Sequence, residues 1–174
     1  MWTPPWVSNR LSGVTDNAAF RRWFRYSTIT DEDLTPLVVF HGGADIANLP
    51  KRQFRVGRGL GKWGAGIYFT PDRWRAKDYA ERNEGVVGGY YLRVENPLVL
   101  YESQAYRDDT ADLIRRVREE GLNDGLIIVQ SDFGKPARLK WNVTEIVVFD
   151  PRQIKSVDNV GTYDPDDPDI LNGF

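Results

Sequence analysis

The sequence has no cysteine and only one histidine among its 174 residues. Without cysteine there is no disulfide framework, no thiolate nucleophile and no cysteine-ligated zinc or iron–sulfur site, and one histidine excludes a site with several histidine ligands. We therefore predict no metal centre. Any chemistry must rest on carboxylates, one imidazole and aromatic side chains.

Long hydrophobic runs and a strong net charge are also lacking. The longest apolar runs have about four residues, whereas a helix needs roughly 20 to cross a bilayer, and the N-terminus shows no signal-peptide pattern. We therefore expect no membrane association. The net charge of -2 argues against a protein that binds nucleic acid over its whole surface.

Apolar residues make up 41% of the chain, which is enough to form one sizeable core. We predict a single domain over residues 1–174. It would carry an irregular N-terminal arm at 1–14, rich in proline, glycine and tryptophan, and an acidic tail at 158–174 with five aspartates and no basic residue, lying at the surface.

Apolar periodicity predicts the main elements. An amphipathic helix of about ten residues begins near Thr15 or Asp16, which can cap it. A second helix, at 71–80, has Pro71 in its first turn and is expected to turn Trp74, Tyr79 and its alanines inward. A third spans 109–120 and ends at Gly121. Strands are predicted at 37–40, 66–70, 90–94, 99–100, 126–129 and 145–149.

The string Gly59–Gly64 matches the Gly-x-Gly-x-x-Gly dinucleotide fingerprint, but its context is wrong. That fingerprint follows a strand and opens a helix, whereas these glycines lead into a predicted strand. We interpret 59–64 as a flexible loop. No phosphate-binding P-loop and no Gly-x-Ser-x-Gly nucleophile elbow occurs either, which argues against a serine hydrolase.

Three features point to a site. His41 follows the predicted strand 37–40 and precedes two glycines, where an imidazole can bond a ligand hydroxyl. Tyr68 and Tyr79 are eleven residues apart and could hold a flat heterocycle between their rings. Glu145 opens a hydrophobic strand, where carboxylates are rare. Taken singly, each also has a structural explanation: a bonded histidine, core tyrosines and a charged edge strand.

The charge is unevenly distributed along the chain. Residues 51–78 carry eight basic and two acidic side chains. This segment is either a solvated loop or an electrostatic patch for a diphosphate or a polyanion.

In this order, the strand ending His41-Gly42, the strand Gly66–Thr70 with Tyr79 after it, and Glu145 resemble the His-Tyr-Glu class of ADP-ribosyltransferases, the diphtheria-toxin-like and poly(ADP-ribose)-polymerase-like group. The segments 20–42, 66–80 and 145–156 are more closely similar to the ADP-ribosyltransferase domains of phage polyvalent proteins and bacterial toxins. The resemblance covers roughly residues 18–170 and includes the ending Phe-Asp-Pro-Arg-Gln-Ile-Lys-Ser.

The resemblance implies an α+β fold, a split β-sandwich of two small antiparallel sheets with flanking helices, that binds NAD as co-substrate without a metal. His41 would bond the adenosine ribose, the Gly42 backbone would bond the nicotinamide carboxamide, and Tyr68 and Tyr79 would flank the nicotinamide ring. Arg58 and Thr70 complete the implied NAD-binding set. The implied catalytic residues are Glu145, His41 and Tyr68, with Glu145 stabilising the charge that develops as nicotinamide leaves.

Two positions depart from relatives in the group. Ala76 stands where polymerase-like members often carry serine, so nicotinamide recognition would lean more on Gly42. Val143 stands two residues before Glu145, where arginine-modifying members carry glutamate. We therefore expect an acceptor other than arginine. Because nothing in the sequence supports chain extension to poly(ADP-ribose), we also expect transfer of a single unit.

The implied function is a mono-ADP-ribosyltransferase toxin or effector that acts on a protein or nucleic acid in the cytoplasm of a target or host bacterium, with an immunity or antitoxin protein as partner. Two alternatives stay open. The same residues would support an NAD glycohydrolase, and the basic segment 51–77 would suit a non-catalytic module that binds NAD or nucleic acid.

Overall fold

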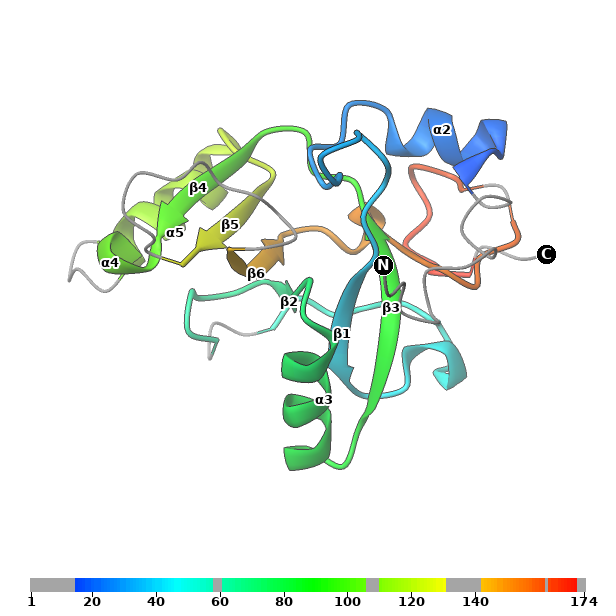
Figure 1. Cartoon of the computed structure of the whole chain (residues 1–174), viewed down its shortest axis with the longest axis horizontal. Helices are drawn as coiled ribbons and strands as arrows, with labels where there is room; N and C mark the ends of the chain where they lie inside the picture. The colour runs from blue at the N-terminus through cyan, green and yellow to red at the C-terminus, as the bar shows by residue number, and fades with distance from the viewer. Residues whose placement is uncertain (1–14, 58–60, 106–109, 131–141, 162, 172–174) are drawn as a thin grey trace, which may run out of the picture.

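The computed structural model describes residues 15–57, 61–105, 110–130, 142–161 and 163–171. The predicted arm at 1–14 lies outside this range. Two sheets form the framework (Figure 1). One has the order β1-β3-β7 and the other β2-β6-β5-β4. Their bounds are β1 Val39–Gly43, β2 Ile67–Phe69, β3 Val86–Leu92, β4 Pro97–Tyr101, β5 Gly125–Val129, β6 Val143–Val148 and β7 Ile154–Ser156.

The predicted α+β class with two small sheets is confirmed, with one exception to the antiparallel expectation. β4 and β5 pair parallel, while the other four pairs are antiparallel. A parallel pair needs a crossover, which contains two helices here. The helices are α2 Ala18–Phe24, α3 Arg73–Arg82, α4 Glu102–Ala105 and α5 Thr110–Glu120, with 3-10 turns η1 Ile46–Asn48 and η2 Pro151–Gln153.

The first predicted helix forms as α2 but is capped by a different residue. Asn17, rather than Thr15 or Asp16, is the N-cap, and its side-chain oxygen accepts from the backbone N–H of Ala19 at 2.7 Å. The predicted apolar face is confirmed. It packs against Tyr91 and Tyr163, and its buried members are Phe20, Trp23 and Phe24.

The bounds of the predicted strands differ from the observed ones by up to four residues, and the differences at β1, β3 and β6 concern His41, Gly88 and Glu145. β1 continues through His41 and both glycines because its backbone pairs with β3 as far as Gly43. β3 begins at Val86 rather than Tyr90. It includes Gly88, over which the Tyr90 hydroxyl lies so closely that a Cβ would collide with it. β6 begins at Val143, so Glu145 is its third residue rather than its first.

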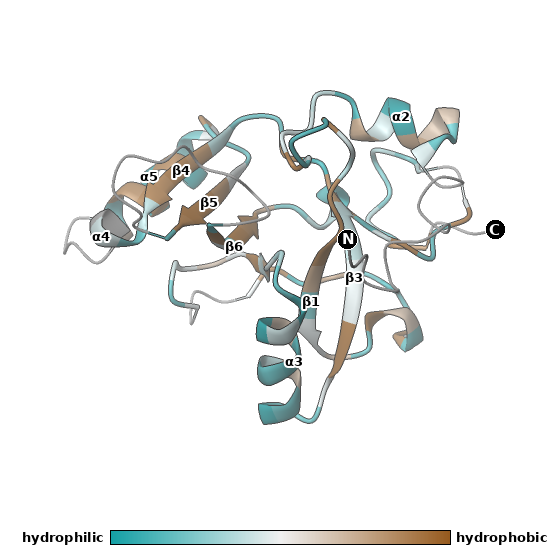
Figure 2. Cartoon of the chain, in the orientation of Figure 1, coloured by the Kyte–Doolittle hydropathy of each residue, from teal (hydrophilic) through white to brown (hydrophobic). Residues whose placement is uncertain are grey.

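The main core lies between the two sheets. One side comes from β1 and β3 and the other from β2, β5 and β6. A second cluster on the opposite face of the larger sheet packs α5 against β4, β5 and β6. Figure 2 shows β4, β5 and β6 coloured as hydrophobic along much of their length. Every residue of β5 is buried. This burial accounts for the continuous apolar sequence of the strand.

The described part of the acidic tail is anchored on the domain by buried groups. Lys155 is fully buried, and its ammonium donates to the backbone carbonyls of Asp167 at 2.8 Å and Asp169 at 2.9 Å. Ile170 is buried, and its N–H donates to the carbonyl of Arg52 at 2.9 Å. The short strand β7, which the apolar pattern did not predict, carries Lys155 and anchors this segment.

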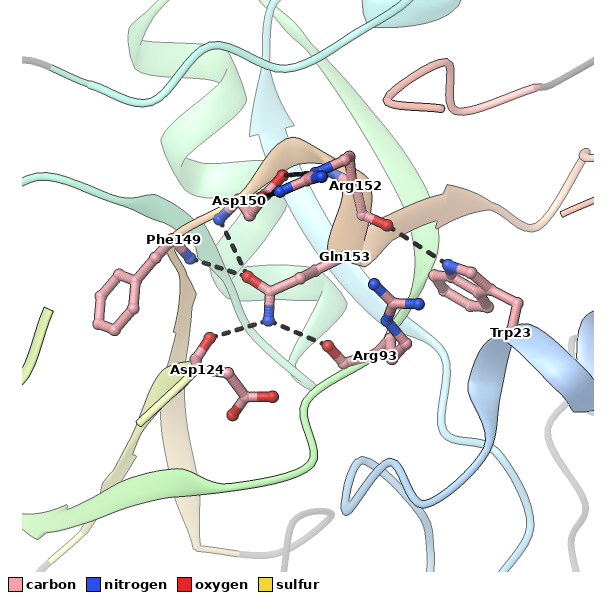
Figure 3. Close-up of polar contacts among 7 residues, drawn as sticks. All are labelled: Trp23, Arg93, Asp124, Phe149, Asp150, Arg152 and Gln153. Atoms are coloured by element: carbon pink, nitrogen blue, oxygen red, sulfur yellow. Dashed lines mark hydrogen bonds and ion pairs between the residues drawn. The ribbon is translucent and has the colours of Figure 1, made fainter. Parts of the chain in front are cut away.

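The ending motif at 149–156 is a structural device (Figure 3). The buried Gln153 side chain accepts from the N–H groups of Phe149 at 3.1 Å and Asp150 at 2.9 Å. Its amide donates to the carbonyls of Arg93 at 3.0 Å and Asp124 at 2.8 Å. One side-chain amide thus satisfies four backbone groups, which lie in three separate loops of the chain. These hydrogen bonds fix the turn between β6 and β7.

The predicted helix at 71–80 forms as α3, with two corrections. Asp72 is the N-cap, so Pro71 precedes the helix instead of occupying its first turn. Trp74 and Tyr79 are 74% and 60% exposed, so the prediction that they face inward was wrong. Only the alanines of the helix are buried, because its backbone lies directly on β1, where larger side chains have no room.

The contact between α3 and β1 depends on Gly42. A Cβ at this position would collide with the backbone carbonyl oxygen of Ala76, and it would lie 2.9 Å from the backbone nitrogen of Ala80. The glycine therefore allows the helix to approach the strand.

We predict that Gly42→Ala lowers the free energy of unfolding by about 3 kcal/mol, because overpacking against a backbone atom cannot be relieved by a rotamer change. Gly89→Ala is the matched control. Gly89 faces Phe40 in the neighbouring strand, and its Cβ would meet only ordinary contacts at 3.4 Å. Urea unfolding of both variants measures the difference, and equal stabilities would contradict this account of Gly42.

Candidate active site

A cleft of about 600 Å³ opens where the two sheets meet, and its volume is typical of small-molecule sites. It is lined by β1, β2, β6, α3 and the connections around them. All of the predicted site residues that the structure describes line it, namely His41, Gly42, Tyr68, Thr70, Tyr79 and Glu145. Arg58 lies outside the described residues.

Two backbone hydrogen bonds join the sheets at this cleft. The Phe40 N–H donates to the Thr70 carbonyl at 2.8 Å, and the Thr70 N–H donates to the Phe40 carbonyl at 2.9 Å. The end of β2 thereby lies beside β1. This contact brings His41 of one sheet next to Tyr68 of the other.

The imidazole of His41 is fixed by its Nδ1, which lies 2.7 Å from the Tyr68 carbonyl oxygen. A carbonyl only accepts, so Nδ1 carries the hydrogen. Burial among aromatic rings, with Phe54 edge-on at a centroid distance of 5.0 Å, lowers the pKa of His41, although the bond to the Tyr68 carbonyl acts in the opposite direction. The neutral ring therefore presents Nε2 as a hydrogen-bond acceptor.

The Tyr68 hydroxyl has two fixed partners. It donates to the Gly64 carbonyl at 2.7 Å and accepts from the Trp63 N–H at 3.0 Å. Burial raises the pKa of Tyr68, and the Trp63 N–H partly offsets this effect. The Tyr68 hydroxyl is thus protonated, and its hydrogen bonds fix the orientation of the ring. Tyr79, in contrast, is largely exposed at the rim of the same cleft.

Glu145 is half-buried on β6, and its carboxylate accepts a hydrogen bond from the indole N–H of Trp63. Tyr68 pairs with Val147, which is two residues along β6 from Glu145. Tyr68 and Glu145 therefore lie on the same face of the sheet. The strand, not a loop, sets the position of the carboxylate.

Trp63 is the site residue that sequence reasoning missed. It is 3% exposed and bonds both Tyr68 and Glu145. The described part of this segment, 61–64, is a loop as predicted, and hydrogen bonds hold Trp63 within it. Gly61 lies so close to the Tyr68 hydroxyl that a Cβ would collide with it. The sequence offered one signal for a role of Trp63, a large aromatic side chain among glycines. The similarity of the glycines to a dinucleotide fingerprint drew attention away from it.

The comparison with protein families decides the identity. A family model described as ADP-ribosyltransferase in polyvalent proteins matches residues 31–162, which is most of the chain. The chain belongs to this family of ADP-ribosyltransferases. The resemblance to the ADP-ribosyltransferase domains of polyvalent proteins is thus confirmed. ADP-ribosyltransferases use NAD as substrate and transfer to a macromolecular acceptor. No curated protein matches the sequence.

The described residues show neither a metal-binding cluster nor a membrane-spanning helix. They contain no group of three or more side chains that could hold a metal ion. In the same part of the chain, no helix is long and apolar enough to cross a membrane.

We predict that His41, observed by NMR as the only histidine, titrates with a midpoint below 6.5, the ordinary value. Since the folded state resists protonation, the unfolded state binds more protons as the pH falls. His41 therefore makes the protein less stable as the pH drops from about 6.5 through the folded-state pKa. A midpoint at or above 6.5 would contradict the burial of a neutral ring.

Proposed function

We propose that this ADP-ribosyltransferase transfers a single ADP-ribose unit, with Glu145 as its catalytic carboxylate. One observation carries the proposal. The cleft brings His41, Tyr68 and Glu145 together from three strands, and the carboxylate is held there by a buried indole. A buried tryptophan that orients a carboxylate in an open cleft suits a charge-stabilising role better than a solubility role.

The cleft has groups suited to each part of NAD. In the proposed pose, Nε2 of His41 accepts a hydrogen bond from an adenosine ribose hydroxyl, and the Gly42 backbone bonds the carboxamide. Thr70 also lines this part of the cleft. The exposed basic side chains of Arg55, Lys62 and Arg75, which line the same cleft, complement the diphosphate.

The two tyrosines are proposed to flank the nicotinamide ring. Tyr68 provides a fixed face because its hydroxyl has two partners. Tyr79 is exposed at the rim of the cleft, so its ring can settle onto the nicotinamide when NAD binds.

The chemical step breaks the bond between the ribose anomeric carbon and the nicotinamide nitrogen. Nicotinamide leaves as a neutral molecule with the bonding electron pair, and positive charge develops on the ribose. Glu145 stabilises that charge through a ribose hydroxyl, as a carboxylate does in glycoside hydrolysis. The acceptor nucleophile then bonds to the anomeric carbon and releases its proton.

The acceptor and the biological role are also proposed. Val143, two residues before Glu145, is a buried apolar residue, so no side-chain acceptor for an arginine guanidinium stands there. Because the matched family is described from polyvalent proteins, we propose a toxin or effector that acts inside a bacterial cell and is countered by an immunity or antitoxin protein.

Glu145→Gln tests the assignment. We expect transfer to fall by about 10²–10³-fold while the Kd for NAD changes little, because the variant keeps the size and loses the charge. Wild type and variant are incubated with a cell lysate and NAD labelled in its adenosine part. Glu119→Gln, on the exposed face of α5, is the matched control.

The distribution of label separates the alternatives. Label in a macromolecular fraction that is lost in Glu145→Gln supports transfer. Label found only in free ADP-ribose would show that the protein hydrolyses NAD instead of transferring ADP-ribose. Undiminished transfer by the variant would overturn the role of Glu145.

Trp63→Phe removes the hydrogen bond to Glu145 and keeps an aromatic ring. We expect kcat for nicotinamide release to fall about 10- to 100-fold, the usual worth of a hydrogen bond to a charged group, with little change in KM for NAD. Thermal unfolding checks that the variant is folded. A kcat close to that of the wild type would mean that the indole N–H does not position the carboxylate.

A further inference from the structure

A second hollow, of about 460 Å³, lies beside the cleft. Its walls are the first turns of α3 on one side and the facing ends of β5 and β6 on the other, and we call it the α3–β6 groove. Phe40 and Arg75 line both the groove and the cleft. A molecule held in the groove therefore lies next to bound NAD.

The α3 wall of the groove is basic. Arg73 and Arg75 are exposed and form no ion pair within the described part of the chain. Lys77 adds a third positive charge, and its Nζ forms an ion pair with Oε1 of Glu81 at 3.5 Å. The one acidic residue on this wall, Asp72, is engaged as the helix cap by the N–H groups of the first turn. The wall thus favours a polyanion.

An exposed indole stands among these charges. Trp74 is 74% exposed, and the Lys77 ammonium lies 5.2 Å from its ring centroid. An aromatic face flanked by basic side chains is the combination that binds single-stranded nucleic acid, because bases stack on the ring and phosphates meet the cations. Gln130, on the opposite wall, offers an amide donor and acceptor to a base edge.

We infer that the α3–β6 groove binds a single-stranded nucleic acid and that this strand is the acceptor. The inference rests on the proposed function and names its substrate class. A base nitrogen or hydroxyl of the strand bonds to the anomeric carbon and loses its proton, while nicotinamide leaves with the electron pair of the broken bond. An acidic protein would match the charges but would not use the indole as a stacking surface.

Binding is tested without NAD. Fluorescence anisotropy measures the affinity of the wild type for two fluorescein-labelled 12-nucleotide probes of mixed sequence, one DNA and one RNA. We expect Trp74→Ala to weaken binding of the preferred probe about tenfold through lost stacking. Arg73→Gln should reduce the slope of log K against log salt by about 0.7.

Matched controls are Tyr26→Ala, which removes an aromatic side chain that is 82% exposed, and Arg116→Gln, which removes an exposed arginine on α5. Both are expected to bind the probes like the wild type. If neither probe binds, or if Trp74→Ala binds as tightly as Tyr26→Ala, the groove is not a nucleic-acid site.

Transfer is tested separately with labelled NAD. Trp74→Ala should release nicotinamide at the wild-type rate without a probe but should label the oligonucleotide at least several-fold more slowly. Label that enters lysate protein and never the probes would overturn the acceptor class while leaving the proposed function intact. If Glu145→Gln kept full transfer, the proposed catalysis would fail, and the anisotropy result would still decide the groove.

Discussion

The two hydrogen bonds between Phe40 and Thr70 are the contact on which the site depends. His41 belongs to one sheet, whereas Tyr68 and Glu145 belong to the other, and the Phe40–Thr70 pair is where β1 and the end of β2 meet. The hydrogen bond from His41 Nδ1 to the Tyr68 carbonyl is a third contact between the two sheets at this place. A rigid pairing of backbones thus positions side chains that lie more than a hundred residues apart in the sequence.

Close packing around the junction requires small residues, while one large residue closes the site. Gly42 allows α3 to lie on β1, and Gly61 allows its loop to cross over the Tyr68 ring. Ala76, at the centre of the α3 contact, is buried there. Trp63 fills the remaining space and connects Tyr68 to Glu145. The glycine-rich loop therefore supports the carboxylate instead of forming a dinucleotide fingerprint.

Prediction from the sequence was best where one local pattern was strong. The strand predicted at 126–129, the helix predicted at 109–120 and the amphipathic helix predicted near Thr15 or Asp16 all form, as β5, α5 and α2. The convergence of His41, Tyr68 and Glu145 on one cleft followed from their order in the resemblance, because neither their spacing nor their residue types alone determines a contact.

The features that were missed depend on contacts between distant segments. β7 is three residues long and includes the buried Lys155, which is held by carbonyls of the tail. Trp74 faces outward because the α3 backbone takes the space on β1. The measurement that tests the account most directly is a crystal structure with a non-hydrolysable NAD analogue. We predict nicotinamide between Tyr68 and Tyr79 with a ribose hydroxyl hydrogen-bonded to Glu145; nicotinamide bound away from Glu145 would contradict the assigned catalytic site.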